Sequence, residues 1–234
     1  MNTLCDLLAR ERRSDHPALR VPGDPAREYD YHRLLTNAWK TGNFLHHCGV
    51  RRGRAVAVVG RTPESVLTFL GTALLGGETR FDPPRTVSTR ALVASIENIA
   101  EYDLPPGGQY VAYGGQPENP KTTHFEREVW SENPTLPPAD ISPTDTALTT
   151  GERSFTHADL LNAANSVVEE TEMNADAEIS LRAPLREPGT VAAGIVAPLC
   201  AGATVLLGNE VGDIAVTLAD GAQEESAIDV STLF

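Results

Sequence analysis

Lysine and positive charge are scarce in this chain of 234 residues. Lys40 and Lys121 are the only lysines, so arginine supplies the rest of the 19 cationic side chains, against 32 Asp and Glu. The formal net charge of -13 predicts a protein from a salt-saturated cytoplasm, such as that of a haloarchaeon, where dense carboxylates keep chains apart. An ordinary acidic protein encoded by GC-rich DNA is the alternative. Either way, this charge disfavours nucleic acid and anionic membranes as partners.

Cysteine and long apolar runs are also scarce. Cys5, Cys48 and Cys200 are odd in number and widely spaced, which excludes a disulfide framework and a cysteine-rich metal site. No stretch approaches the roughly 18 apolar residues of a membrane span, and residues 1–13 lack the apolar centre of a signal peptide. We therefore expect a soluble cytoplasmic protein with reduced thiols and no metal site.

Hydrophobic residues make up 41% of the chain, enough for a real core. Residues 55–59 form an unbroken apolar run of strand length. Thr62 is a good helix N-cap, Pro63 suits a first helical turn, and apolar residues continue over 66–75. A second strand is expected over 79–81. Strand, helix and strand in this order predict a parallel crossover unit.

Helix caps predict further elements in the first hundred residues. Thr3 begins a short helix, and Asp30 begins a longer one that stops at Gly49. Residues 90–101 are expected to be helical, and residues 110–113 to form a short strand. A basic turn follows the second helix and offers a site for an anion or for a partner's carboxylates; it contains Arg51, Arg52 and Arg54.

Eight of the 17 prolines lie between residues 104 and 144, which disfavours long helices and predicts an extended connector. The expected organisation is therefore a first α/β subdomain over 1–103, this Pro/Gly-rich connector over 104–144, and a second α/β subdomain over 145–234. The fold class is α/β, with mostly parallel sheets flanked by helices.

The second subdomain has its own regular pattern. A helix is expected to start at Thr156 and His157, with one apolar face. Strands are expected over 178–181 and 204–207, with a helix of small residues over 190–201.

Residues 145–160 resemble the phosphate-loop region of the AMP-binding, adenylate-forming acyl-CoA and acetyl-CoA synthetase family. That family has an Asp-x-Ala strand, a loop of the type Thr-Ser-Gly-Thr-Thr-Gly-x-Pro-Lys-Gly, and a Thr-His pair that opens a helix. Here the strand begins at Asp145 and the pair is Thr156-His157, but most of the loop between them is missing. Residues 49–58 and 198–207 resemble the same family. The resemblance implies the N-terminal lobe of a ligase, degenerate in its loop and truncated to the front half.

The resemblance also implies site residues. Vestigial nucleotide contacts would fall on Thr149, Thr150, Gly151, Arg153 and His157, with Arg153 the cation nearest the lost loop lysine. His157 is either a nucleotide neighbour or an ordinary first-turn histidine, and the pattern favours the second. The positions that resemble the acyl pocket are Arg186, Glu187 and Gly189.

Three functional hypotheses follow. The chain is a catalytically silent, ligase-like protein that binds a partner or a small ligand; or it is the front half of an active acid-thiol ligase completed by another chain; or it is a self-associating structural protein. The family's magnesium glutamate, ribose aspartate and C-terminal lysine have no counterpart here, so no catalytic residue is assigned. No cofactor is expected, and ATP with magnesium is expected only for the ligase alternative. A protein partner or self-association is expected.

Overall fold

The computed structural model describes residues 1–23, 26–151, 153–218, 223–224 and 226–234. The chain divides into two compact units, one made of Met1–Leu35 with His157–Phe234 and the other of Thr36–Thr156. Helix α1 (Tyr31–His47) runs from the first unit into the second. This division differs from the predicted boundaries of 1–103, 104–144 and 145–234, because the N-terminal segment pairs with strands near the C-terminus.

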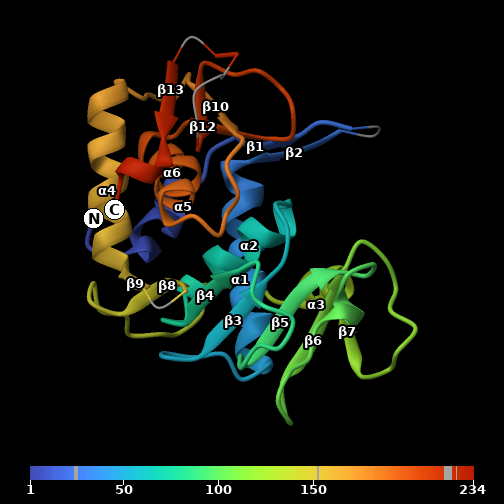
Figure 1. Ribbon diagram of the computed structural model, residues 1–234. Helices are drawn as coiled ribbons and strands as arrows, with labels where there is room; N and C mark the ends of the chain where they lie inside the picture. The colour runs from blue at the N-terminus through green and yellow to red at the C-terminus, as the bar shows by residue number, and fades with distance from the viewer. Residues whose placement is uncertain (24–25, 152, 219–222, 225) are drawn as a thin grey trace. The chain divides into compact units, whose positions relative to one another are not determined.

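The first unit is built on a six-stranded sheet in the order β13-β12-β10-β11-β1-β2. All neighbours are parallel except the antiparallel pair β1 and β2. Leu19 pairs with Val205, which ties the N-terminal hairpin to the last third of the chain (Figure 1). The elements of this unit are η1 (Leu4–Leu8), η2 (Arg10–Arg12), β1 (Pro17–Val21), β2 (Arg27–Asp30), α4 (His157–Thr171), β10 (Glu178–Leu181), α5 (Pro188–Val191), the π-helical η4 (Ala192–Val196), α6 (Ala197–Ala201), β11 (Thr204–Leu207), β12 (Ile214–Thr217), β13 (Ser226–Asp229) and η5 (Val230–Thr232).

The second unit is built on a seven-stranded sheet in the order β7-β6-β5-β3-β4-β8-β9. Its strands are parallel except for the antiparallel pair β8 and β9. Helix α2 packs against β3 and β4, and helix α3 packs against β6 and β7 (Figure 1). The elements are β3 (Ala55–Val58), α2 (Pro63–Ala73), β4 (Glu78–Phe81), β5 (Ala91–Ser95), η3 (Ile99–Glu101), β6 (Gln109–Tyr113), β7 (Thr122–His124), α3 (Phe125–Ser131), β8 (Thr146–Thr150) and β9 (Arg153–Thr156).

The predicted crossover unit is confirmed as β3, α2 and β4. The side chain of Thr62 accepts a hydrogen bond from the Ser65 N–H, and the capping box with Ser65 is complete. Pro63 occupies the first turn, where a missing N–H costs nothing. The α/β fold class with two mostly parallel sheets flanked by helices is likewise confirmed.

Two sequence predictions fail in the second unit. Residues 90–101 are not a helix, because Ala91–Ser95 form a central strand between β3 and β6, and only the short η3 follows. Residues 104–144 are more than a connector, because they supply β6, β7 and α3. The sequence of a short apolar run is compatible with either a buried strand or a helix. Here the run forms a strand because it pairs with β3 on one side and with β6 on the other.

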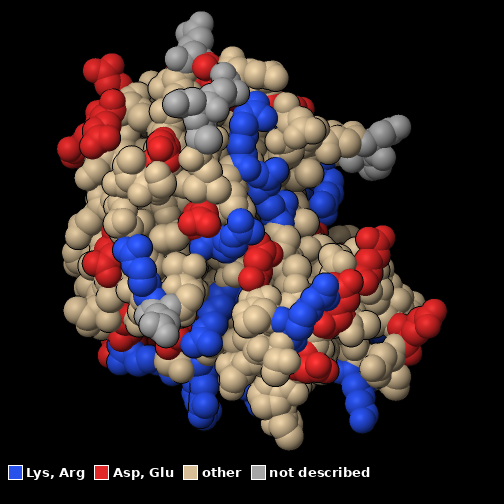
Figure 2. Space-filling view, in the orientation of Figure 1, with Lys and Arg blue, Asp and Glu red and all other residues tan. Residues whose placement is uncertain are grey.

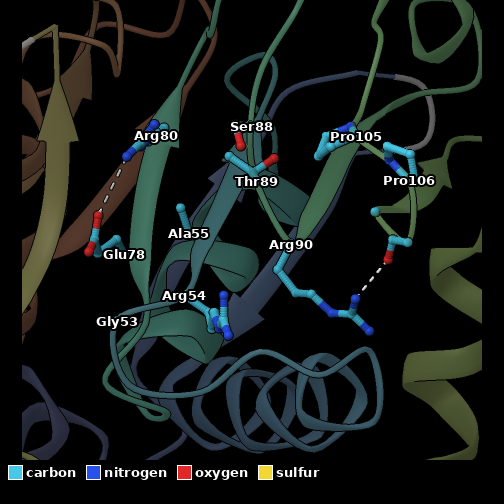
Figure 3. Close-up of a pocket in the computed structure, with 12 residues that line it drawn as sticks. Gly53, Arg54, Ala55, Glu78, Arg80, Ser88, Thr89, Arg90, Pro105 and Pro106 are labelled. Carbon is cyan, nitrogen blue, oxygen red and sulfur yellow. Dashed lines mark hydrogen bonds and ion pairs between the residues drawn. The ribbon is translucent and has the colours of Figure 1, made fainter.

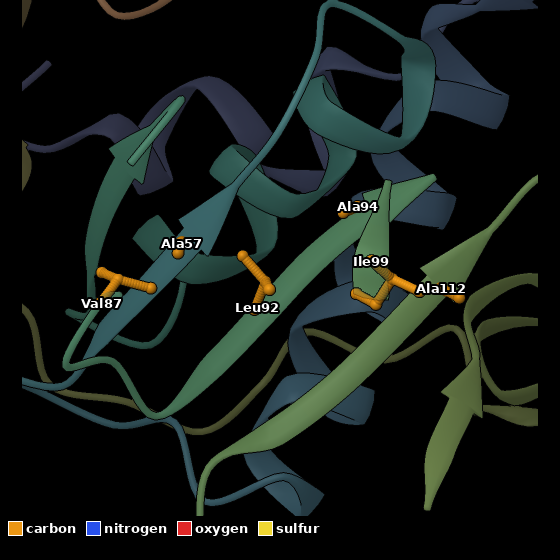
Figure 4. Close-up of a cluster of buried hydrophobic side chains, with 6 residues drawn as sticks. All are labelled: Ala57, Val87, Leu92, Ala94, Ile99 and Ala112. Atoms are coloured by element: carbon orange, nitrogen blue, oxygen red, sulfur yellow. The ribbon is translucent and has the colours of Figure 1, made fainter. Parts of the chain in front are cut away.

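A hydrophobic cluster covers one face of the second sheet (Figure 4). Ala57, Leu92 and Ala112 come from three neighbouring strands. Val87 and Ile99 come from the segments on either side of β5 and pack against them. The cluster therefore holds the segments before and after β5 against the sheet.

Side chains of both signs, Lys and Arg as well as Asp and Glu, are exposed on the face drawn in Figure 2. Among the residues that the structure describes, no helix is long and apolar enough to cross a membrane.

Candidate functional site

The predicted phosphate-loop region is a tight β-hairpin. Strands β8 and β9 are antiparallel, Thr149 pairs with Ser154, and Thr150 pairs with Arg153. Only residues 151 and 152 connect them. Gly151 has a φ of +56°, in the left-handed region that two-residue hairpin turns use. Thr149 and Thr150 are thus strand residues rather than parts of a loop that can wrap an anion.

The side chains of Thr149 and Arg153 contact neighbours in the same sheet. Thr149 Oγ1 lies 3.4 Å from both Glu78 Oε2 and Ser154 Oγ. The guanidinium carbon of Arg153 lies 5.0 Å from the centre of the Phe155 ring, so this cation stacks along its own strand. The cation nearest the missing lysine position is therefore held at the side of a hairpin rather than inside a phosphate cradle.

His157 begins α4 and is completely buried. Its Nδ1 accepts a hydrogen bond of 3.2 Å from the backbone N–H of Leu4, the first residue of η1. Early N–H groups of a helix have no partner within the helix, so this bond satisfies a donor that would otherwise be buried and unpaired. The structure gives the His157 ring a contact that ties the N-terminal segment to α4.

Of the residues that resemble the acyl pocket, Arg186 and Glu187 lie between β10 and α5, and Gly189 lies within α5. Arg186 Nε is 3.5 Å from Glu187 Oε1, and the Arg186 side chain is 58% exposed. A Cβ atom on Gly189 would lie 2.2 Å from the carbonyl oxygen of Val230, so α5 approaches the C-terminal segment at a distance that only glycine allows. Gly189 therefore has a packing role in this unit.

An ion pair lies near the same turn. Arg182 follows β10 and donates from Nε to Glu224 Oε1 at 2.9 Å. The Arg182 hydrogen bond lowers the pKa of the Glu224 carboxyl group. The charge of Arg182 is thus largely balanced within the protein.

The three cysteines and the potential metal ligands show no sign of reactivity either. Burial raises the pKa values of Cys5, Cys48 and Cys200 to about 11, so these thiols are protonated at neutral pH. Within the described ranges, no group of three His, Cys, Asp or Glu side chains is arranged to hold a metal ion.

The structure also forms a groove that the sequence analysis did not identify, with a volume of about 320 Å³. It lies in the second unit at the amino ends of β3 to β6, around a floor that includes Ala55 (Figure 3). Of the predicted basic turn, only Arg54 lines the groove, whereas Arg52 is paired with Asp145 at 2.6 Å. The lining residues are Gly53, Arg54, Ala55, Glu78, Arg80, Ser88, Thr89, Arg90, Pro105, Pro106, Gly107 and Gly108.

Searches with the sequence found no matching protein-family model and no matching curated protein. Solved structures, in contrast, match over nearly the whole chain. The anthranilate CoA ligase AuaEII, in complex with anthranoyl-AMP, superposes with a TM-score of 0.76 at 18% identity, over 92% of this chain and 49% of the ligase. The N-terminal domain of FACL13 from Mycobacterium tuberculosis superposes with a TM-score of 0.74 at 15% identity, over 93% and 63%. ATP-bound MatB from Rhodopseudomonas palustris superposes with a TM-score of 0.72 at 12% identity, over 92% and 49%.

At such identities the likeness concerns the fold. The chain spans about half the length of the full ligases that it matches. It has the α/β architecture of the N-terminal lobe of adenylate-forming ligases.

Proposed function

We propose that this chain has the ligase fold without adenylation activity, and that it acts by binding a partner or a small ligand. The observation that carries the proposal is the β8–β9 hairpin. Adenylation depends on positioning a triphosphate and neutralising its charge, and converging backbone N–H groups are the main device for both. Two connecting residues supply too few such groups.

The side chains around the hairpin support the same conclusion. Arg153 lies against Phe155, and His157 is buried against Leu4. Neither residue replaces the family's loop lysine. The ligase fold here is a scaffold, because a fold shared with enzymes carries no chemistry unless the site is present.

The test is ATP–pyrophosphate exchange by the purified chain in molar salt, with a panel of short, long and aromatic carboxylic acids. We expect no carboxylate-dependent exchange above a heat-denatured sample. Exchange by the isolated chain that follows substrate concentration contradicts the proposal.

A second candidate is the front half of a ligase that another chain completes. The observation that favours it is the extent of the match, about half of each full ligase. Co-purification from the native host in high salt, followed by the exchange assay on the complex, separates the two. An active complex containing the remainder of a ligase supports the second candidate, and an inactive complex with an unrelated partner supports the first.

A further inference from the structure

The groove in the second unit borders three arginines that come from three separate segments. Arg54 precedes β3, Arg80 lies in β4, and Arg90 precedes β5. Figure 3 shows Arg80 on one side of the floor, Arg54 below it and Arg90 toward the other side. We propose that this groove binds a small phosphate-bearing anion such as a phosphomonoester.

The charge of the groove matches this ligand. The lining residues include three arginines and one carboxylate, that of Glu78, which gives a formal excess of about two positive charges. A phosphomonoester carries about -1.5 to -2 charges at neutral pH, with three acceptor oxygens. Guanidinium groups bind such oxygens in pairs, so arginine suits phosphate better than lysine does.

The arginines differ in how firmly they are held. Arg90 donates from Nε to the carbonyl of Cys48 and from a terminal nitrogen to the carbonyl of Gly107, each at 2.7 Å, and these bonds fix its plane. Arg80 has only a long ion pair of 3.7 Å with Glu78, and its buried Nε has no hydrogen-bond partner among the described residues. One arginine is therefore preorganised, and Arg80 retains an unused donor.

Thr89 gives an independent indication of a ligand. Its side chain lines the groove, the residue is only 6% exposed, and Oγ1 has no hydrogen-bond partner in the part of the chain that the structure describes. A buried hydroxyl without a partner destabilises the folded state. A phosphate oxygen in the groove would accept this hydrogen bond and remove that cost.

The groove is separate from the β8–β9 hairpin, the region that resembles the phosphate loop. It lies at the amino ends of β3 to β6, whereas the hairpin turn at Gly151 follows the carboxyl end of β8, which runs parallel to β4. Phosphate binding in the groove therefore does not depend on whether adenylation has been lost, and the two proposals fail by different measurements.

The experiment is calorimetric titration of the full chain, at one fixed potassium chloride concentration, with inorganic phosphate, glycerol 3-phosphate and succinate. Succinate is the matched control, because it is a dianion without a tetrahedral phosphate. We expect both phosphates to bind, and succinate to bind at least about tenfold more weakly. Absence of phosphate binding, or equal binding of succinate, overturns the proposal.

Variants locate the site. Arg80→Ala is expected to weaken phosphate binding about tenfold or more. Arg51→Ala removes the same charge from the neighbouring turn, outside the groove, and is expected to change affinity less than about twofold. Equal losses of phosphate affinity in the two variants would show that phosphate is attracted by the overall positive charge of this region rather than bound in the groove. That result would overturn the assignment of the groove.

Thr89→Val separates a binding role from a folding role. Valine has a similar shape and removes the unpaired hydroxyl, so the ligand-free protein is expected to be at least as stable as the parent. Phosphate affinity is expected to fall several-fold. A Thr89→Val protein that is equally stable and binds phosphate as tightly as the parent contradicts the proposed contact.

Discussion

Thr150 and Arg153 face each other as cross-strand partners, so the β8–β9 hairpin closes after only two intervening residues. The strand that leads into this turn and the helix that follows it resemble those of a ligase, but the turn lacks the length to surround a phosphate. A two-residue strand connection thus stands at the position that resembles the family's anion-binding loop. This relationship is the basis of the non-catalytic proposal.

His157 is expected to stabilise the fold. His157→Ala removes a buried ring and leaves the Leu4 N–H without its acceptor, so the free energy of unfolding should fall by about 2–4 kcal/mol. Chemical denaturation measures the difference. His46→Ala, on an exposed position of α1, is the matched control and should stay within about 0.5 kcal/mol of the parent. Equal, small effects of both changes would contradict the structural role.

Gly71 is expected to stabilise the close contact between α1 and α2. A Cβ atom at Gly71 would lie 2.8 Å from the backbone nitrogen of Gly42, where neither helix can yield by rotating a side chain. Gly71→Ala should therefore cost about 1–3 kcal/mol in unfolding free energy, despite the better helix propensity of alanine. In Gly115→Ala the new Cβ would be an ordinary 3.5 Å from Ile96, and a change below about 0.5 kcal/mol is expected. Thermal denaturation of both variants tests the difference.

The three thiols are expected to make the protein sensitive to alkaline pH. Their folded pKa values of about 11 lie above the ordinary value of 9.0, so the folded state keeps protons that the unfolded state releases. This contribution is present below about pH 9 and is lost as pH rises toward 11. Denaturation across this window should show the loss, and a variant with alanine at Cys5, Cys48 and Cys200 should show less of it. The variant should keep part of the decline, because burial also raises the pKa of Tyr31. Identical pH profiles for parent and variant would exclude the thiols as the cause.

Salt is expected to raise stability. A formal net charge of -13 repels itself in the compact state, and added salt screens that repulsion. The thermal midpoint should rise between dilute and molar potassium chloride. A midpoint that does not move would count against the prediction of a salt-adapted protein.

The sequence predicted those parts of the fold that local signals determine. The caps of α1 and α2 and the apolar runs of β3 and β11 are local, and all four elements were predicted. Strand β5 was mistaken for part of a helix, because a run such as Ala-Leu-Val-Ala has no period that distinguishes the two. The pairing of Leu19 with Val205 joins residues far apart in the chain, so no local signal predicts that the N-terminal segment and the C-terminal segment form one compact unit.

Among the candidate sites, too, the features set by local sequence were predictable and those set by distant residues were not. The shortness of the loop at Gly151 is visible in the sequence, because it is a matter of counting residues. The acceptor role of His157 is not, because its partner Leu4 lies 153 residues away. The groove was missed for the same reason, because Arg54, Arg80 and Arg90 meet only when three parallel strands align their amino ends.

The most direct test of the central claim is calorimetric titration of the full chain with magnesium ATP and with acyl-adenylate analogues in high salt. The groove proposed to bind phosphate would be a separate source of ATP binding, so the titration is run on the parent, on Arg80→Ala, on Arg153→Ala and on Gly151→Val. We expect no binding of the acyl-adenylate analogues, and no ATP binding that depends on Arg153 or Gly151. Micromolar binding that survives Arg80→Ala and disappears in Arg153→Ala or Gly151→Val would contradict the account, because it would mean that the hairpin still holds a nucleotide.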